Sequence, residues 1–272
     1  MSTATDQAHH DAHAAAADAR VTVRELDTGD MAAAASLLSS IWGTPAVEPP
    51  LMVALSHSGA YVAGAFDGER MLGACIGYFA QPLGRSLHSH VAGVAPGTGR
   101  RGIGVALKLH QRAWAVDRGL SRITWTFDPL VARNAAFNLE RLGVDIAEYL
   151  VDFYGQMSDG VNAGQGSDRL LASWRLEAPW PVERDVIAEP DPARASAVLS
   201  IDGDGAPHPH LASPDAEVLT VAVPADVEAL RRTDPTLAAR WRGAVRGAML
   251  PLLERGHVIH AFHDHRYLLG RP

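Results

Sequence analysis

The chain has 272 residues, of which 47% are hydrophobic and 20% are charged, and its formal net charge is −7. This length accommodates one large domain or two modest ones with a sizeable core. The negative charge argues against general nucleic-acid binding, and a single cysteine, Cys75, excludes an internal disulfide and a cysteine-based zinc site. Because no apolar run reaches membrane-spanning length and no signal-peptide pattern is present, a cytoplasmic protein without a membrane partner is expected.

Residues 1–20 are rich in alanine, histidine and aspartate and show no periodicity that would build a core. We therefore expect a disordered tail outside the fold. His9, His10 and His13 are metal-ligand residue types, but an untethered tail is the favoured interpretation, and no metal site is predicted.

Short apolar runs with strand or helix periodicity continue from residue 21. An Asp67-Gly68 turn predicts a hairpin between two of the strands. In chain order, the predicted elements are a strand at 21–26, helices at 31–41 and 49–55, strands at 61–66, 71–79 and 86–95, a helix at 103–118, a strand at 123–127, a helix at 133–142 and strands at 144–150 and 170–176.

The C-terminal third begins after Trp180-Pro181. It is either a small independent α+β domain or, as we favour, a half-domain that extends the first sheet and covers an acceptor cleft. The domain organisation predicted is a tail at 1–20, a first domain at 21–178 and a C-terminal extension at 179–272. Its predicted elements are strands at 196–201, 218–223, 258–263 and 266–269 and a helix at 235–255.

A glycine-rich basic turn stands between the strand that ends before Pro96 and the helix that begins at Ile103. The first turn of a helix has unpaired N–H groups and the positive end of the helix dipole, and glycines let a phosphate approach the backbone. Arg100 and Arg101 add positive charge where a diphosphate would lie. The turn lacks the Gly-Lys-Ser/Thr ending of nucleotide hydrolases, and a structural turn is the alternative interpretation.

The turn resembles the acetyl-CoA loop of the GNAT acetyltransferases, whose pattern is Arg/Gln-x-x-Gly-x-Gly/Ala. Either Arg101-Gly-Ile-Gly104-Val-Ala106 supplies the pattern, or Gly102 and Gly104 are its two glycines and Gly99 stands at the Arg/Gln position. The predicted order of elements is also the GNAT order. Further motifs, which resemble a subgroup of predicted GNAT proteins of similar length over residues 20–271, are Trp125-Thr-Phe-Asp-Pro-Leu130, Arg133-Asn134, Asn138 and Leu142-Gly143.

The resemblance implies an α/β (α+β) GNAT fold, in which a mixed, V-splayed central sheet is flanked by helices. It implies an N-acyltransferase that uses acetyl-CoA or another acyl-CoA and transfers directly to the amine of a small molecule or peptide. The alternative is a CoA-binding regulatory or structural protein without turnover. A homodimer through exposed strands of the second half is expected. The cofactor-binding residues implied are Ala92, Val94, Gly99, Arg100, Arg101, Gly102, Ile103, Gly104, Val105, Asn134 and Asn138.

Candidate catalytic groups follow from what amine acylation requires, namely a base for the amine and a proton donor for the thiolate. His88 and His90 alternate on the strand before the loop and suit the base, unless they only bond within the sheet. Asp128 ends the next strand and is a base, an ammonium anchor or a turn cap. In the family, a tyrosine acts as the general acid, and the corresponding position in this sequence is Leu139. The resemblance therefore leaves Tyr149, Tyr154 or water to protonate the thiolate.

Overall fold

The computed structural model describes residues 3–98, 101–155, 166–181, 194–213 and 216–272. The chain divides into two compact units, unit 1 of residues 1–125 and 174–180 and unit 2 of residues 126–173 and 181–272. The division falls inside two strands, whereas the sequence predicted a boundary at residue 178. A strand that passes from one compact unit to another changes neither composition nor hydropathy, so it leaves no linker signal in the sequence.

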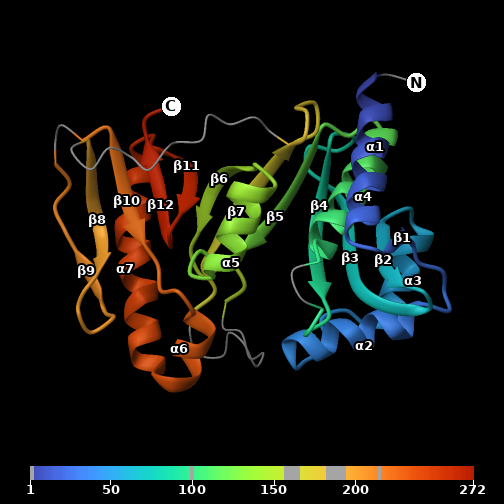
Figure 1. Ribbon diagram of the computed structural model, residues 1–272, viewed down its shortest axis with the longest axis horizontal. Coiled ribbons are helices and arrows are strands. Elements are labelled where there is room, and N and C mark those ends of the chain that lie inside the picture. The colour runs from blue at the N-terminus through green and yellow to red at the C-terminus, as the bar shows by residue number, and fades with distance from the viewer. Residues whose placement is uncertain (1–2, 99–100, 156–165, 182–193, 214–215) are drawn as a thin grey trace. The chain divides into compact units, whose positions relative to one another are not determined.

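Unit 1 contains a mixed sheet in the order β1-β2-β3-β4-β5 (Figure 1). Its first four strands pair antiparallel, and β4 and β5 pair in parallel. The predicted hairpin turn is confirmed between β2 and β3, where Gly68 has a φ of +58°. The strands are β1 (Thr22–Glu25), β2 (Tyr61–Asp67), β3 (Arg70–Ala80), β4 (Ser86–Val94) and β5 (Arg122–Phe127).

Three predicted helices of unit 1 are confirmed as α2 (Met31–Trp42), α3 (Pro49–His57) and α4 (Ile103–Asp117). Helix α2 ends at Gly43, whose left-handed backbone lets its N–H bond to Ser39 O. Gly93 of β4 lies so close to α2 that a Cβ atom there would stand 2.6 Å from Ile41 Cδ1. Among the described residues, no helix is long and apolar enough to cross a membrane.

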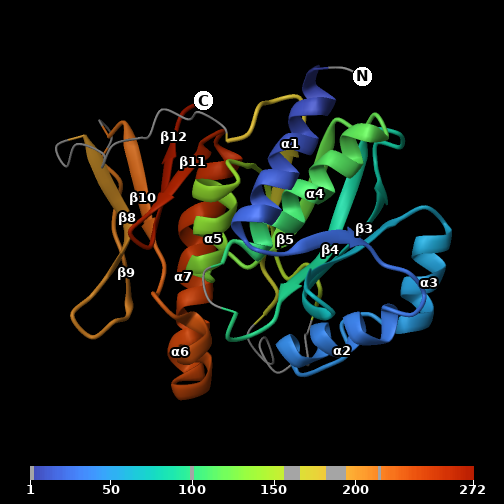
Figure 2. The ribbon, with the colours of Figure 1, turned by 45° about the vertical axis from the view of Figure 1, so that its right-hand side comes forward.

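The first described residues form a helix, α1 (Thr3–Asp18), which lies alongside α4 in both Figure 1 and Figure 2. Ala8 and Ala12 are buried, and Asp11 forms a buried ion pair with Arg112 of α4. The prediction of a disordered tail is therefore wrong. Alanine has the highest helix propensity and lets helices approach closely, but its small side chain gives little of the hydrophobic periodicity by which a packed helix is recognised.

Unit 2 contains an antiparallel pair, β6 with β7, and a separate five-stranded sheet in the order β11-β12-β10-β8-β9. Its C-terminal strands thus form a sheet of their own, and the prediction that they extend the first sheet is wrong. Helix α7 packs on β8, β9 and β10. The strands are β6 (Asp145–Leu150), β7 (Arg169–Arg175), β8 (Ala195–Ile201), β9 (Pro207–Pro209), β10 (Val218–Ala222), β11 (Val258–His263) and β12 (Arg266–Gly270).

The helices of unit 2 include one with a local change of pitch. The helix predicted at 133–142 starts as an α-helix and continues as a π-helix. The short helix α6 was not predicted; its N-cap Asp226 accepts a hydrogen bond from Ala229 N–H. The helices are α5 (Ala132–Ala135), η1 (Ala136–Arg141), α6 (Val227–Thr233) and α7 (Pro235–Glu254).

Candidate functional site

Strands β4 and β5 separate near the middle of β4. In the described part of the chain, the two strands pair only from Ser86–Arg122 to His88–Thr124, while β4 continues six residues further and stays paired with β3. The β3–β4 register skips His90, which marks a β-bulge at that residue. The second half of β4 therefore presents backbone N–H and C=O groups along an edge that β5 does not cover.

The turn after β4 ends at the amino terminus of α4. Gly97 and Gly102 have φ values of +80° and +84°, a region that favours glycine, and Thr98 Oγ1 donates to Ala95 O. The first helical hydrogen bond runs from Ala106 N–H to Gly102 O. The N–H groups of the preceding turn lie before this ladder and are available to an anion. Gly99 and Arg100, two predicted phosphate contacts, lie outside the described residues.

Arg101 is the described arginine of this turn, and its guanidinium is engaged within unit 1. Nη2 donates to the carbonyl oxygens of Ala19 and Arg20, just after α1, and Nη1 pairs with Asp67 at 3.1 Å. In this arrangement the Arg101 side chain anchors the turn to the end of α1. The side chains of Ile103 and Val105 are buried, so these residues offer a ligand their backbone rather than their side chains.

The two histidines of β4 lie on the side of the sheet that carries Tyr78. Their ring centroids are 5.5 Å (His88) and 5.7 Å (His90) from the Tyr78 ring, and His88 Nδ1 lies 3.2 Å from Thr124 Oγ1. Desolvation, with the nearby His90 and Lys108, lowers the pKa of His88 to about 4, and desolvation also lowers the pKa of His90. Both imidazoles are therefore neutral near pH 7, which is the form a general base requires, and the lowered pKa makes His88 a weak base.

Beneath β4, the structure shows a buried lysine that the sequence analysis missed. Lys108 Nζ donates to Ser89 Oγ at 2.8 Å and lies 3.8 Å from the centroid of the Trp125 ring. Burial lowers the pKa of Lys108 to about 8. The available signal was its place on α4, where a lysine stands within the otherwise apolar segment from Val105 to Leu109.

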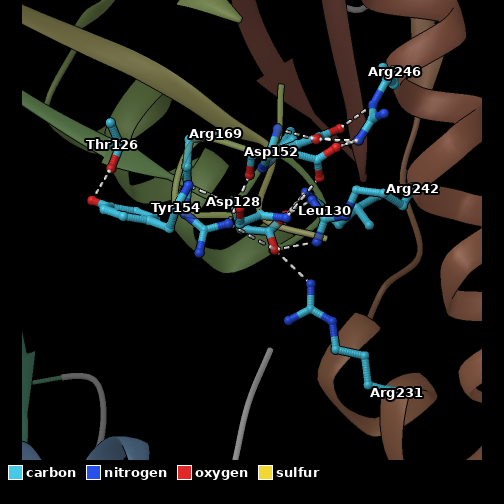
Figure 3. Close-up of polar contacts among 12 residues, drawn as sticks. Thr126, Asp128, Leu130, Asp152, Tyr154, Arg169, Arg231, Arg242 and Arg246 are labelled. Atoms are coloured by element: carbon cyan, nitrogen blue, oxygen red, sulfur yellow. Dashed lines mark hydrogen bonds and ion pairs between the residues drawn. The ribbon is translucent and has the colours of Figure 1, made fainter. Parts of the chain in front are cut away.

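Asp128 lies at the centre of a cluster of arginines in unit 2 (Figure 3). Arg242 binds both of its carboxylate oxygens at 2.8 and 2.6 Å, Arg231 approaches to 2.6 Å, and Arg169 lies at 3.8 Å. Burial would raise the pKa of Asp128, but the attraction of these arginines outweighs it and holds the pKa at about 2. Asp128 also accepts the N–H of Leu130, as the predicted turn cap would, and in this setting it is a locked carboxylate rather than a poised base.

The two candidate tyrosines differ in their surroundings. Tyr149 is buried and donates to Asp168 Oδ2 at 2.8 Å, and burial together with Asp168 raises its pKa. Tyr154 is 42% exposed, and its hydroxyl lies 3.0 Å from Thr126 Oγ1. Arg246 completes this group by binding both oxygens of Asp168 at 2.9 and 2.6 Å. Tyr154 is thus the more accessible proton donor.

The amide candidates lie on the helix that changes pitch. Asn134 is half-buried on α5, whereas Asn138 is buried on η1. Leu139 is also buried on η1. A π-helical turn inside an α-helix is often found at functional sites, but periodicity in sequence does not distinguish it from a regular helix.

The predicted site residues are thus divided between the two units. Unit 1 brings together the histidines, the edge of β4 and the turn before α4, and unit 2 holds the asparagines, the tyrosines and Asp128. The sequence analysis missed the arginines around Asp128 because they are about 40 to 115 residues distant along the chain. These residues are Arg169, Arg231 and Arg242.

Neither a comparison with protein-family profiles nor one with curated protein sequences finds a match. Among solved structures, a putative acetyltransferase from Salmonella typhimurium with its cofactor acetyl-CoA is 17% identical, with a TM-score of 0.48 over 59% of this chain and 98% of that one. The ribosomal-protein-S18-alanine N-acetyltransferase of Escherichia coli is 16% identical, with a TM-score of 0.48 over 57% and 94%. A phosphinothricin acetyltransferase from Sinorhizobium meliloti, in complex with AcCoA, is 13% identical, with a TM-score of 0.49 over 64% and 97%.

Proposed function

We propose that the chain is a GNAT-type N-acyltransferase that uses acetyl-CoA or another acyl-CoA. One observation carries the proposal: β4 leaves β5 after His88, and its uncovered edge leads into a glycine-rich turn at the amino terminus of α4. A strand edge of this kind can pair with the amides of a pantetheine arm, as an added strand would. The helix terminus beyond it supplies N–H groups and a positive dipole for a diphosphate.

The proposed cofactor contacts are made largely by the backbone. Ala92 and Val94, in the uncovered half of β4, would face the pantetheine arm, and the N–H groups from Gly102 to Val105 would hold the diphosphate. Gly99 and Arg100 remain proposed contacts. We assign the Arg101 side chain to anchoring the turn, because its donors are already directed to two carbonyl oxygens and a carboxylate. Asn134 and Asn138 are proposed to bind the pantetheine arm.

The proposed chemistry is direct transfer in a ternary complex. His90, on the exposed edge of β4, accepts the proton of the ammonium group, directly or through water, with His88 as the second candidate. The neutral amine then attacks the thioester carbonyl, a C–N bond forms and the C–S bond breaks. The thiolate takes a proton from Tyr154 or water, and the second proton lost by the amine nitrogen restores that donor. We give Asp128 and Tyr149 supporting roles in unit 2, since each is held in an ion-pair or hydrogen-bond network.

The alternative function is CoA binding without turnover, in a regulatory or structural protein. Two observations favour it: Leu139 is buried where the family has its tyrosine acid, and the Tyr149 hydroxyl is bound to Asp168. The two functions share the cofactor site and differ in chemistry. Binding and turnover therefore have to be measured separately.

The first test is calorimetric titration of acetyl-CoA and CoA into the protein. Gly104→Glu places a carboxylate in the first turn of α4, where it suits the helix dipole but repels a diphosphate. Gly104→Gln is the matched control with the same length and no charge. We expect Gly104→Glu to weaken binding at least about tenfold relative to Gly104→Gln. Equal affinity in the two variants, or no binding to the wild type up to about a millimolar, would refute the cofactor site.

The second test is acetyl-CoA-dependent thiol release with a panel of amines. We expect His90→Gln to lower kcat/KM by about a hundredfold while leaving acetyl-CoA binding unchanged. His88→Gln is the matched variant two residues away on the same strand. Binding of acetyl-CoA with no thiol release from any amine would support the alternative function.

A further inference from the structure

A groove of about 640 Å³ lies within unit 1, between α1, β1 and α4. Its volume falls in the range of small-molecule sites, which is roughly 300–1,000 Å³. Much of its wall is apolar and made of small side chains, including Ala12 and Ala16 of α1, Val23 of β1 and Ala113 of α4. The groove could therefore accommodate an apolar body of modest size.

The groove is lined by the β1 carboxylate of Glu25. Glu25 Oε1 accepts a hydrogen bond from Trp114 Nε1 at 2.9 Å, which fixes the carboxylate without neutralising it. His110 also lines the groove, and its Nδ1 lies 2.9 Å from the hydroxyl of Tyr61. Burial lowers the pKa of His110, and the nearby His9 and His13 lower it further, although Glu25 acts in the opposite direction. The imidazole is therefore neutral near pH 7 and leaves the charge of Glu25 uncompensated.

Besides Glu25, the groove is lined by one aspartate and one arginine. Asp117 carries a second carboxylate, which lies 2.9 Å from Nε2 of His9. Arg118 supplies the positive charge, and its guanidinium lies 3.7 Å from the centroid of the Trp114 ring. Two carboxylates, those of Glu25 and Asp117, thus face the one guanidinium of Arg118 among the residues that line the groove, so the site is complementary to a cation.

We propose that this groove binds a primary ammonium group carried on a small apolar body. The ammonium ion would take the carboxylate of Glu25 as its partner, and the apolar body would lie against the alanines and valines of the wall. None of the residues that line the groove belongs to the proposed cofactor turn. His110 lies seven residues beyond Ile103, the first residue of α4, which corresponds to about 10 Å along the helix axis.

The test is calorimetric titration of phenethylamine into the full chain at pH 7.5, with 2-phenylethanol as the neutral probe of the same shape. Three variants complete the design. Glu25→Gln removes the charge and keeps an oxygen for Trp114, Ala16→Phe fills the groove, and Glu69→Gln removes a charge from the exposed turn between β2 and β3. Circular dichroism and acetyl-CoA titration of each variant report whether the fold and the cofactor turn are retained.

We expect the amine to bind at least about tenfold more tightly than the alcohol, and the advantage to disappear in Glu25→Gln. We expect Ala16→Phe to abolish binding of both probes and Glu69→Gln to leave binding unchanged. Equal binding of amine and alcohol would overturn the recognition of charge. Unchanged binding in Glu25→Gln and Ala16→Phe would overturn the location, and absence of binding up to about 20 mM would overturn the site. Failure of acetyl-CoA binding would bear on the proposed function alone.

Discussion

The two units of the molecule each bury a charged side chain, and they do so in opposite ways. In unit 1, Lys108 is 4% exposed and is surrounded by uncharged partners, the hydroxyl of Ser89, the amide oxygen of Gln111 and the ring of Trp125. In unit 2, Asp128 is 6% exposed and is surrounded by arginines. Among the described residues, no carboxylate lies within ion-pair distance of Lys108.

The consequence is a difference in what each charge does near neutral pH. Desolvation favours the uncharged form, and only opposite charges compensate for it fully. Uncharged partners leave the pKa of Lys108 at about 8, so the ammonium group can lose its proton just above neutral pH. The arginines hold the pKa of Asp128 at about 2, so its charge is fixed over the physiological range. Both groups are buried, and their partners decide the outcome: the charge of Lys108 is labile near neutral pH, and the charge of Asp128 is permanent.

The largest change in stability is expected from removing an arginine that binds the carboxylate of Asp128. Arg242 donates to both carboxylate oxygens of Asp128. Because Arg242→Leu would leave this buried carboxylate without its bidentate partner, we expect the free energy of unfolding to fall by about 3–5 kcal/mol. Urea unfolding followed by circular dichroism measures it. The matched control is Arg266→Ala, which breaks an exposed ion pair with Asp264 and should cost less than about 1 kcal/mol. Similar losses in both variants would contradict the central position of Arg242.

Removing the ammonium group of Lys108 is expected to change stability by a smaller amount and in the opposite direction. The pKa of Lys108 is about 8 in the folded protein and about 10.4 in an unfolded chain, so the unfolded state binds more protons between these values. Stability should therefore rise with pH from 8 to 10.4 by up to about 3 kcal/mol. Lys108→Met removes the ionisable group and keeps the length of the side chain. We expect it to be more stable than the wild type at pH 7 and the difference to shrink towards pH 10.

The measurement is urea unfolding of both proteins at pH 7, 8, 9 and 10, taken as the difference between them so that other titrating groups cancel. His57→Gln, at the carboxyl end of α3, provides a control with an ionisable group removed elsewhere. A constant difference between Lys108→Met and the wild type across this range would show that the buried ammonium group does not titrate there.

The sequence predicted the parts of the molecule that depend on local pattern. The hairpin turn at Gly68 and the helix predicted at 31–41 are confirmed, because turn chemistry and helical periodicity depend on neighbouring residues. Helix α1 was missed, since its stability comes from contact with α4 and not from its own periodicity.

The two buried charges show a second limit of the sequence. Asp128 was interpreted as a base, an anchor or a cap, because nothing adjacent to it indicated that Arg231 and Arg242 would contact it from 103 and 114 residues away. The strand that contains His88 and the turn at Gly102 could be predicted because both follow from local pattern. The proposed function rests on the point at which β4 and β5 stop pairing. Because these two strands are distant along the chain, local sequence pattern does not predict where their pairing ends, and only the family resemblance implied it.

The smallest change in stability is expected at low pH, where the carboxylate of Asp128 becomes protonated. Because the pKa of Asp128 is about 2 in the folded protein and about 3.9 when unfolded, its charged form stabilises the fold above pH 4. This contribution, about 2.5 kcal/mol, is lost as the pH falls from 4 towards 2. Asp128→Asn lacks this titration, so we expect the wild type to exceed it in stability at pH 6 and the gap to narrow between pH 4 and 2.5. Urea midpoints of the two proteins measure the difference in stability, and a difference that stays constant over this range would show that Asp128 does not titrate there.

Together with Lys108→Met, Asp128→Asn separates the two pH dependences of stability. The locked carboxylate of unit 2 contributes a pH dependence below pH 4, and the labile ammonium group of unit 1 contributes one above pH 8.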